Sequence, residues 1–128
     1  MKIYGIGVDL LEIKRIKKLL KSKKNFKKKI FTIHENKLSR SIKNKEIYFG
    51  KRFAAKEAFS KALGTGISDG LNFNEIETFS NNKGKPSLRI LGKSRIIVKK
   101  ILKNKKYTIY LSLSDEKTYA IAFVVIAL

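Results

Sequence analysis

Apolar residues in the first part of the chain follow first a strand pattern and then a helical one. Residues 2–10 are rich in Ile, Val and Tyr, which is typical of a strand. Residues 12–20 repeat Ile and Leu at helical spacing, with Lys and Arg on the other face, and predict an amphipathic helix. The basic residues 22–29 are expected to form a short helix or a loop. Thr32 followed by Glu35 is a capping box, which predicts that a short helix begins there.

The strongest helical pattern lies in the middle of the chain. A polar stretch, residues 39–45, precedes it and interrupts the apolar spacing. Residues 47–63 are then built mainly from Ala, Phe, Lys and Glu, and Gly64 ends the pattern. The sequence therefore predicts one long central helix.

The second half of the chain changes to strand patterns around one further helix. The predicted strands are residues 74–79, 87–91, 107–113 and 118–127, and the predicted helix is residues 92–102. The turn sequence Asn81-Asn-Lys-Gly-Lys85 joins the first two strands, and the last two form a closing hairpin. The whole pattern predicts an α+β fold, with a mainly antiparallel sheet packed against the long central helix.

Length and composition are those of one soluble domain, expected to span residues 1–128. The hydrophobic fraction of 43% is ordinary for a folded chain. The absence of cysteine excludes disulfides and thiolate metal ligands and fits the cytoplasm. The sequence begins directly with strand-like residues, and its longest apolar run, residues 119–128, is too short to cross a bilayer. We expect a cytoplasmic protein without a membrane partner.

The charge of the chain is strongly positive. Thirty Lys and Arg against ten Asp and Glu give a net charge of +20 and a pI near 10.2. Such a charge suggests a basic RNA- or ribosome-binding module as one class of function. However, only five of the thirty cations are Arg, and the aromatic residues fall at core spacing rather than on one stacking face. A solvated basic surface produced by coding bias, or attraction to an acidic protein or a polyphosphate ligand, explains the charge equally well.

A few acidic residues lie at positions that make them candidates for a metal site or a catalytic site. Glu57 and Lys61 lie four residues apart on the long helix, where they form either a surface ion pair or part of a site. Asp9 lies in the apolar first strand, where it either caps the following helix or binds a hard cation. Asp9 and Glu57 together supply the carboxylates that Mg²⁺ needs when a diphosphate provides the remaining ligands. A single His and no Cys disfavour zinc.

Two glycine-containing segments are candidates for contact with phosphate. Gly64-Thr65-Gly66 is a helix C-cap whose backbone N–H groups are also able to approach an anion. A helix C-terminus repels anions, so Arg52 and Lys61 would have to supply the positive charge. Gly84-Lys85-Pro86 is either a plain turn or a loop that contacts a ligand.

These segments together resemble the bacterial holo-(acyl-carrier-protein) synthases, the small type of 4'-phosphopantetheinyl transferase. The resemblance rests on Gly5-Ile-Gly-Val-Asp9-Leu-Leu-Glu-Ile-Lys-Arg15-Ile16, Phe31-Thr-Ile-His-Glu35, Arg52-Phe-Ala-Ala-Lys-Glu57-Ala-Phe-Ser-Lys61-Ala-Leu-Gly-Thr-Gly66, Gly84-Lys85-Pro86 and Leu113-Ser-Asp115-Glu-Lys-Thr-Tyr119-Ala. The order and spacing of these pieces extend over nearly the whole chain. Each piece is weakly specific, and the combination is highly specific.

The resemblance implies a magnesium-dependent transfer of the 4'-phosphopantetheine arm from coenzyme A to a serine of acyl carrier protein. Asp9 and Glu57 then correspond to the metal ligands, and Glu57 and Lys61 to the catalytic groups. The residues expected to bind coenzyme A are Arg52, Lys61, Gly64, Thr65, Gly84, Lys85 and Pro86. Lys14, Arg15 and Lys18 correspond to the docking surface for the acidic carrier protein. The resemblance also implies a homotrimer with active sites between subunits and no nucleic-acid partner.

One position departs from the pattern of many relatives. Asp115 stands where those relatives carry a His that meets the 3'-phosphate of the nucleotide. An ionised acid cannot bind a phosphate in that way, so Arg52 or a Lys would have to make the contact. Asp115 is therefore not expected to be a phosphate ligand.

Overall fold

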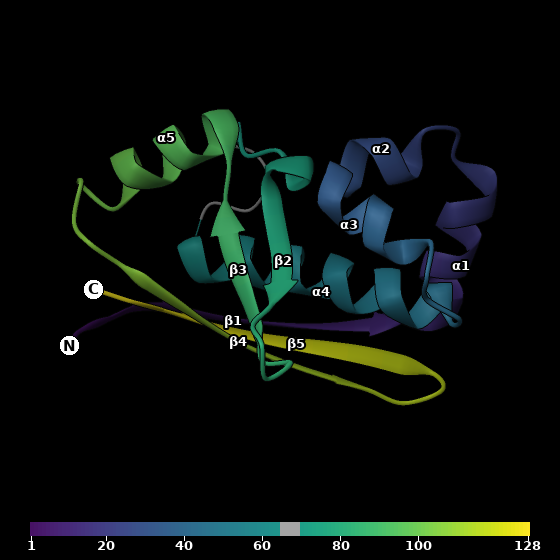
Figure 1. The fold of residues 1–128 in the computed structure, drawn as a ribbon. Coiled ribbons are helices and arrows are strands. Elements are labelled where there is room, and N and C mark those ends of the chain that lie inside the picture. The colour runs from purple at the N-terminus through teal and green to yellow at the C-terminus, as the bar shows by residue number, and fades with distance from the viewer. Residues whose placement is uncertain (65–69) are drawn as a thin grey trace.

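The structure, a computed structural model, describes residues 1–64 and 70–128 (Figure 1). Its helices are α1 (Ile13–Ser22), α2 (Phe26–Ile30), α3 (Ile33–Ser39), α4 (Lys45–Leu63), the short 3₁₀ helix η1 (Phe73–Glu75) and α5 (Gly92–Ile101). Its strands are β1 (Ile3–Glu12), β2 (Ile76–Ser80), β3 (Pro86–Ile90), β4 (Thr108–Asp115) and β5 (Tyr119–Ala127). The α+β fold predicted from the sequence is confirmed, with antiparallel pairing throughout these strands.

The strands form two sheets rather than one. Strands β1, β5 and β4 lie side by side in that order, and β2 pairs with β3 separately. The closing hairpin of β4 and β5 was predicted, but the pairing of β1 with β5 was not, because no local pattern specifies it. This pairing brings the two ends of the chain together: the backbone N–H of Lys2 donates to Leu128 O at 3.2 Å, and the Leu128 N–H donates to Lys2 O at 2.7 Å.

Helix α4 lies on the inner face of the three-stranded sheet, and α5 lies on the side of α4 away from this sheet (Figure 1). The β2–β3 hairpin runs past the side of α4, and β3 lies next to β4. The residues of α4 are mostly buried, including Phe49, Phe59 and the alanines that follow Phe53. A helix that is apolar on most of its circumference is enclosed by protein. The sequence correctly predicted this helix as the centre of the fold.

The contact between α4 and β1 is close enough to require glycine. A Cβ atom on Gly5 would lie 1.9 Å from the backbone oxygen of Ala62, and one on Gly7 would lie 2.0 Å from that of Ala58. Neither distance is compatible with a side chain, so the two glycines and the two alanines let the helix rest on the strand backbone. The next inward-facing residue of β1 after Gly7 is Asp9, because side chains alternate along a strand.

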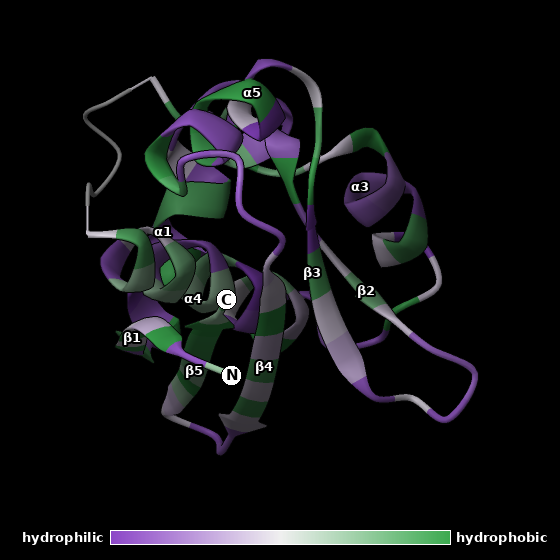
Figure 2. Ribbon diagram, turned by 90° about the vertical axis from the view of Figure 1, so that its left-hand side faces the viewer, coloured by the Kyte–Doolittle hydropathy of each residue, from purple (hydrophilic) through white to green (hydrophobic). Residues whose placement is uncertain are grey.

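The outer face of the three-stranded sheet is apolar and exposed. On β1, Ile6, Val8 and Leu10 expose 60%, 49% and 63% of their surface. On β5, Ile121 and Phe123 are exposed at 39% and 44%. Figure 2 shows hydrophobic segments recurring along these strands. An apolar face of this kind on one chain is typical of a protein–protein contact surface.

Several boundaries differ from the sequence predictions in ways that bear on the site. Strand β1 continues to Glu12, which is the N-cap of α1, so the alternative that Asp9 caps this helix is wrong. Part of the basic stretch after α1 forms the helix α2. The capping box of Thr32 and Glu35 is confirmed, with both of its hydrogen bonds present. None of the helices in the described ranges is long and apolar enough to cross a membrane.

Candidate active site

Asp9 and Lys61 meet where α4 crosses β1. The Lys61 Nζ atom lies 3.2 Å from Asp9 Oδ1 and 3.0 Å from the backbone oxygen of Val8, to which it donates. The side chain of Asp9 is 16% exposed, whereas that of Lys61 is 54% exposed. Lys61 therefore forms its ion pair with Asp9 on the strand. The interpretation as a surface pair required an ion pair with Glu57 on the same helix, which Lys61 does not form.

Glu57 lies one helical turn before Lys61 on the same side of α4. Partial burial raises the pKa of the Glu57 carboxyl, and the nearby negative charge of Asp9 raises it further. The positive charges of Lys61 and Arg15 act in the opposite direction. A nearby cation favours the ionised form of such a carboxyl. The structure thus brings Asp9, Glu57, Lys61 and Arg15 into one electrostatic cluster.

The donor set of this cluster fits a hard cation only in part. Across the described residues, no three side chains of His, Cys, Asp or Glu gather closely enough to hold a metal ion by themselves. Asp9 and Glu57 offer carboxylate oxygens, which are the ligands that Mg²⁺ prefers. Mg²⁺ commonly takes only one or two carboxylates and completes its octahedron with water and substrate phosphate. The pair is therefore sufficient for Mg²⁺ that arrives with a phosphate-bearing substrate.

Helix α1 presents its basic face next to this cluster. Ile13 and Ile16 are buried, and this fixes the helix so that Lys14, Arg15, Lys17 and Lys18 are exposed. Arg15 is close enough to lower the pKa of Glu57, while Lys14 lies beside a separate hollow with Lys17 and Glu46. The predicted docking residues therefore share one exposed face, and Arg15 is the one that approaches the acidic pair.

A cavity of about 390 Å³ opens beside Glu57. Its walls come from α1 and α2, from α4 and from residues 71–73, and they include Phe26, Phe53 and Phe73. Phe53 stacks on Phe26 at 6.1 Å and meets Phe73 edge-to-face at 5.9 Å. None of these aromatic residues was predicted from the sequence to line a site. The only available signal was that Phe53 precedes Glu57 by one helical turn.

Arg52 lies away from the Asp9 cluster, against the side of α4 that faces α3. Its guanidinium carbon is 3.6 Å from the centre of the Tyr48 ring, and its Nη1 donates to Tyr48 O at 3.3 Å. Burial lowers the pKa of Arg52, and its buried Nε has no hydrogen-bond partner. A buried guanidinium nitrogen without an acceptor is able to take one from a ligand.

The glycine segments have the local structures that the sequence indicated. Gly64 caps α4 with a φ of 88°, and its N–H donates to Ser60 O and Lys61 O. Thr65, a predicted coenzyme A contact, lies outside the described residues. Gly84 has a φ of 77° at the tip of the β2–β3 hairpin, where the side chain of Asn81 accepts from Lys83 and Lys85. In the described part of the chain, no hydrogen bond or ion pair joins this turn to Asp9, Glu57 or Lys61.

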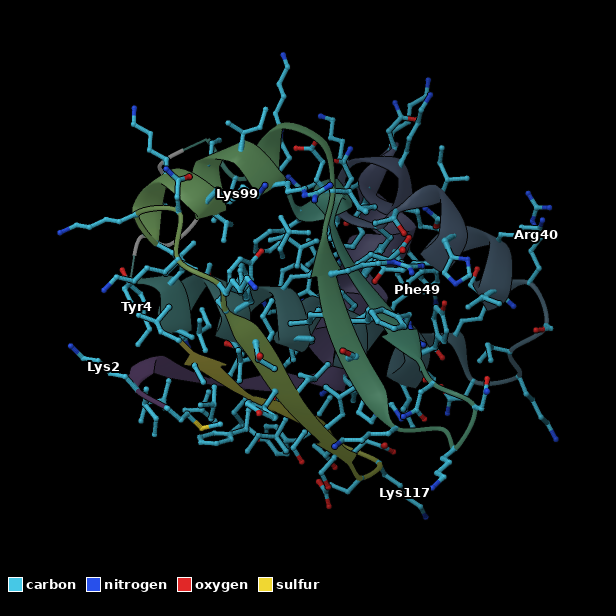
Figure 3. The ribbon with its side chains drawn as sticks, turned by 60° about the vertical axis from the view of Figure 1, so that its left-hand side comes forward. Lys2, Tyr4, Arg40, Phe49, Lys99 and Lys117 are labelled. Atoms are coloured by element: carbon cyan, nitrogen blue, oxygen red, sulfur yellow. The ribbon has the colours of Figure 1, made fainter. Side chains whose placement is uncertain are left out.

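The remaining cations are mostly solvated. Figure 3 shows the side chains of Lys2, Arg40 and Lys117 extending away from the molecule, whereas Phe49 lies inside it. A larger hollow, about 640 Å³, lies near the chain ends and is lined by Lys99, Lys105 and Lys106. It contains none of the predicted site residues. The chemistry of the carboxylate cluster, rather than the size of the hollow, identifies the candidate site.

Comparison with known proteins decides the family. The model of the 4'-phosphopantetheinyl transferase superfamily matches residues 5–124. The chain belongs to this superfamily. A holo-(acyl-carrier-protein) synthase from Pelagibacter ubique is 48% identical over 126 residues, which cover 98% of each chain.

Solved structures of relatives agree with this assignment to the superfamily. The holo-(acyl-carrier-protein) synthase of Neisseria meningitidis superposes with a TM-score of 0.86 at 35% identity, covering 98% of this chain and 99% of the other. The enzyme of Bacillus anthracis, solved in complex with CoA (3',5'-ADP), gives a TM-score of 0.81 at 34% identity, covering 98% and 97%. An RNA-binding module has no support among these relatives.

Asp115 is engaged within the chain itself. Its carboxylate lies 3.1 Å from Lys51 Nζ, a side chain that projects from α4 one residue before Arg52. Whether Asp115 contacts a phosphate stays a question for the site with substrate bound.

Proposed function

We propose that the chain transfers the 4'-phosphopantetheine group of coenzyme A to a serine of apo acyl carrier protein and releases 3',5'-ADP. The observation that carries this proposal is the meeting of Asp9, Glu57 and Lys61 where α4 rests on β1. The relatives with the same fold are holo-(acyl-carrier-protein) synthases, and one of them was solved with coenzyme A. A carboxylate pair beside a lysine is suited to a diphosphate substrate.

Asp9 and Glu57 hold the Mg²⁺ in this proposal. The bound ion supplies positive charge that neutralises the diphosphate as the transfer proceeds. Burial and, after it, the negative charge of Asp9 raise the pKa of Glu57, so a cation bound beside the two carboxylates would favour the ionised form of Glu57. Gly5 and Gly7 let α4 rest on β1, which brings the element that carries Glu57 against the strand that carries Asp9.

The transfer exchanges one phosphorus–oxygen bond for another. The serine oxygen bonds to the phosphorus that carries the pantetheine arm, and the bond from that phosphorus to the departing nucleotide breaks. The nucleotide leaves with the electron pair of the broken bond. The serine proton passes to a carboxylate or a water of the site.

Lys61 acts on the phosphate side of the reaction. Its ammonium is more than half exposed and reaches Asp9 along the surface of α4, so it is free to contact a phosphate that binds there. A fixed positive charge next to the transferred group stabilises the charge that develops on it. Lys61 therefore binds coenzyme A and stabilises the leaving diphosphate oxygen.

The other coenzyme A contacts come from the far side of α4 and from two turns. Arg52 contributes its guanidinium, whose buried Nε lacks an acceptor. Gly64, Thr65, Gly84, Lys85 and Pro86 remain proposed contacts. Within one chain the structure does not join the Arg52 side to the Asp9 cluster, which fits a substrate site that continues onto a neighbouring copy.

The carrier protein docks on the basic face of α1, through Lys14, Arg15 and Lys18. Acidic partners are attracted to such a face over several ångströms, which raises the association rate more than the affinity. The cavity beside Glu57 opens between α1 and α4 and receives the part of the substrate that approaches the reacting serine. Arg15 connects the docking face to the reacting site, because it lies near Glu57.

The assembly is a homotrimer, and the active sites lie between its subunits. The outer face of β1, β5 and β4 exposes Ile6, Val8, Leu10, Ile121 and Phe123, which a lone chain would leave in water. Such a face favours association with further copies, since burying apolar surface stabilises a complex. The resemblance to the bacterial synthases supplies the number of copies, and the sheet face supplies the contact surface.

The decisive assay is intact-mass analysis of apo acyl carrier protein after incubation with this chain, coenzyme A and Mg²⁺. The expected result is the added mass of one phosphopantetheine group, with 3',5'-ADP released in equal amount. Replacing Mg²⁺ with excess chelator should abolish the change. A carrier protein that keeps its apo mass under conditions where a known synthase modifies it would rule the function out.

A further inference from the structure

A fully buried ion pair lies next to the proposed site, and the proposed chemistry does not use it. Lys56 Nζ lies 2.7 Å from Glu35 Oε1, and both side chains are 0% exposed. Lys56 also donates to Phe73 O at 2.9 Å and to Ile76 O. Burial lowers the pKa of Lys56, and the charge of Glu35 opposes this effect.

Glu35 forms further hydrogen bonds within this network, at the start of α3 and on β2. Its carboxylate accepts from the Thr32 N–H at 2.9 Å, from the Thr78 N–H at 2.9 Å and from the Thr78 hydroxyl at 2.7 Å. Together with Lys56, it ties α3, α4, η1 and β2 to one another. A buried ion pair rarely stabilises a fold more than well-packed apolar residues would, because removing both charges from water is costly. A gain in the stability of the fold therefore does not by itself explain why this buried pair is present.

The network reaches the cavity beside Glu57 from both sides. Lys56 immediately precedes Glu57 on α4, so its anchoring fixes the rotation of the helix at that turn. Phe73, whose backbone oxygen accepts from Lys56, lines the same cavity as Glu57 and packs on Phe53. The hydrogen bond from Lys56 thus joins the wall of the cavity formed by residues 71–73 to the helix that carries Glu57.

We propose that Lys56 is a positioning residue. With Glu35, it sets the distance between Glu57 and the cavity wall formed by residues 71–73, called here the Phe73 wall, and so controls how the acceptor substrate enters the cavity. This inference rests on the proposed transferase function. A misplacement of about 1 Å at a reacting centre is enough to lower the rate by roughly a hundredfold. Lys56 touches no substrate in this scheme and acts through Glu57 and Phe73.

Loss of the Lys56–Glu35 pair should change the KM for the carrier protein and the KM for coenzyme A to different extents. Lys61 reaches its phosphate from the opposite side of α4 and contacts neither Lys56 nor Glu35. Arg52 is hydrogen-bonded to Tyr48, whose hydroxyl donates to the backbone oxygen of Glu35. The charges of Glu35 and Lys56 also act on Arg52, but in opposite directions, so removing both together largely cancels this effect. Substitutions confined to the side chains of the pair leave that link in place.

The test uses the double variant Glu35→Gln with Lys56→Met. A single Lys56→Met change leaves a buried carboxylate unpaired and is prone to unfold the chain, whereas the double change removes both charges. Leu102→Ala is the matched control, because Leu102 is 2% exposed and lies at the C-terminal end of α5. It lowers stability without touching the network. Kinetics are measured well below the unfolding temperature of all three proteins.

For the double variant we expect the KM for the carrier protein to rise about tenfold or kcat to fall by about as much, with the KM for coenzyme A unchanged within about twofold. Leu102→Ala should keep all three constants near those of the wild type. Amide exchange at Glu75 and Ile76 should be faster in the double variant than in Leu102→Ala at equal global stability. This exchange reports on the Phe73 wall whether or not transfer is measurable.

The outcomes separate the two proposals. A wild-type chain that does not modify the carrier protein overturns the function, and the exchange result then decides whether Lys56 holds the Phe73 wall. An active wild type, together with a double variant that has wild-type constants, overturns the positioning role. A parallel rise in both KM values also overturns it, since that pattern indicates a general disturbance of the fold.

Discussion

Lys61 lies 3.2 Å from Asp9, although 52 residues separate them in the sequence. The pair exists because Gly5 and Gly7 let α4 rest directly on the backbone of β1, which leaves the next inward side chain of the strand, Asp9, facing the last turns of the helix. The same approach brings Glu57 within reach of the charge of Asp9. The site is thus a consequence of how closely one helix and one strand pack.

Gly7→Ala should separate α4 from β1 and disrupt the site. The added Cβ would lie 2.0 Å from the backbone oxygen of Ala58, and a backbone atom of a buried helix cannot move aside cheaply. We expect a loss of about 1–3 kcal/mol or more in the free energy of unfolding. Transfer activity should fall further than this loss explains. Urea titration and the transfer assay measure the two effects.

Gly50→Ala is the control for this prediction. Its Cβ would meet only the flexible end of Ile13 at 3.0 Å, within α4, where Ala is a better helix former than Gly by up to about 1 kcal/mol. Stability should therefore change little. Equal losses in the Gly7 and Gly50 variants would show that the close α4–β1 contact is not special.

Glu57→Gln should stabilise the chain at neutral pH while removing activity. The raised pKa of Glu57 means that its ionised form is disfavoured in the folded state, so this form lowers stability above the ordinary value of 4.5. The gain from the Gln substitution should be small, because the positive charges of Lys61 and Arg15 partly offset the effects that disfavour the ionised form. It should disappear as the pH falls below 4.5, where the carboxyl is protonated in both states. Thermal melts across this pH range measure it.

Glu46→Gln provides the comparison for Glu57. Glu46 lies in the first turn of α4, where an acid is favourable because of the helix dipole. Its loss should lower stability slightly at neutral pH. A stability gain for both variants would point to general relief of charge rather than to the repulsion between Asp9 and Glu57.

Reversing charge on α1 should weaken the use of the carrier protein specifically. Lys14→Glu combined with Lys18→Glu should raise the KM for the carrier several-fold, because steering of an acidic partner depends on this face. Lys99→Glu with Lys100→Glu makes the same change in net charge on α5, away from α1. Steady-state kinetics at low and moderate salt compare the two. Equal effects would mean that total charge, rather than the α1 face, attracts the carrier.

Ile6→Lys should break the assembly. Ile6 is 60% exposed on the outer face of β1, and a charge placed in a buried contact between copies is costly. The mass in solution should fall from that of a trimer to that of a single chain, and activity should fall with it. Ile96→Lys, at a side chain 69% exposed on α5, should leave the mass unchanged. Light scattering after gel filtration gives both masses, and a wild-type monomer would contradict the assembly.

The local features of the fold were predictable from the sequence. The capping box at Thr32, the glycine stop at Gly64 and the turn around Gly84 depend on neighbouring residues, and each is present. The helix boundaries of α4 moved by only two residues, because Asn44 caps it just before the predicted start. Local hydrogen bonds and backbone preferences are determined by short stretches of sequence.

The long-range features were not predictable in the same way. Glu35 was identified only as half of a capping box, whereas its carboxylate also binds Lys56, 21 residues away, and Thr78, 43 residues away. Lys56 resembled any lysine of a helix until its complete burial was known. The partner of Lys61 was not predicted either, since Glu57 is its neighbour on the helix but Asp9 is its partner in space. Which face of α4 meets which strand depends on the whole fold.

The central claim is that the cluster of Asp9, Glu57 and Lys61 performs the transfer, and Asp9→Asn tests it most directly. Asp9 forms its ion pair with exposed Lys61, so the amide should keep the fold while removing one proposed metal ligand. The measurement is a time course of the intact mass of apo acyl carrier protein, with wild type and variant at equal concentration, coenzyme A and Mg²⁺. We predict rapid gain of one phosphopantetheine with the wild type and a rate lower by at least roughly a hundredfold with the folded variant. A variant that modifies the carrier protein at the wild-type rate would contradict the account.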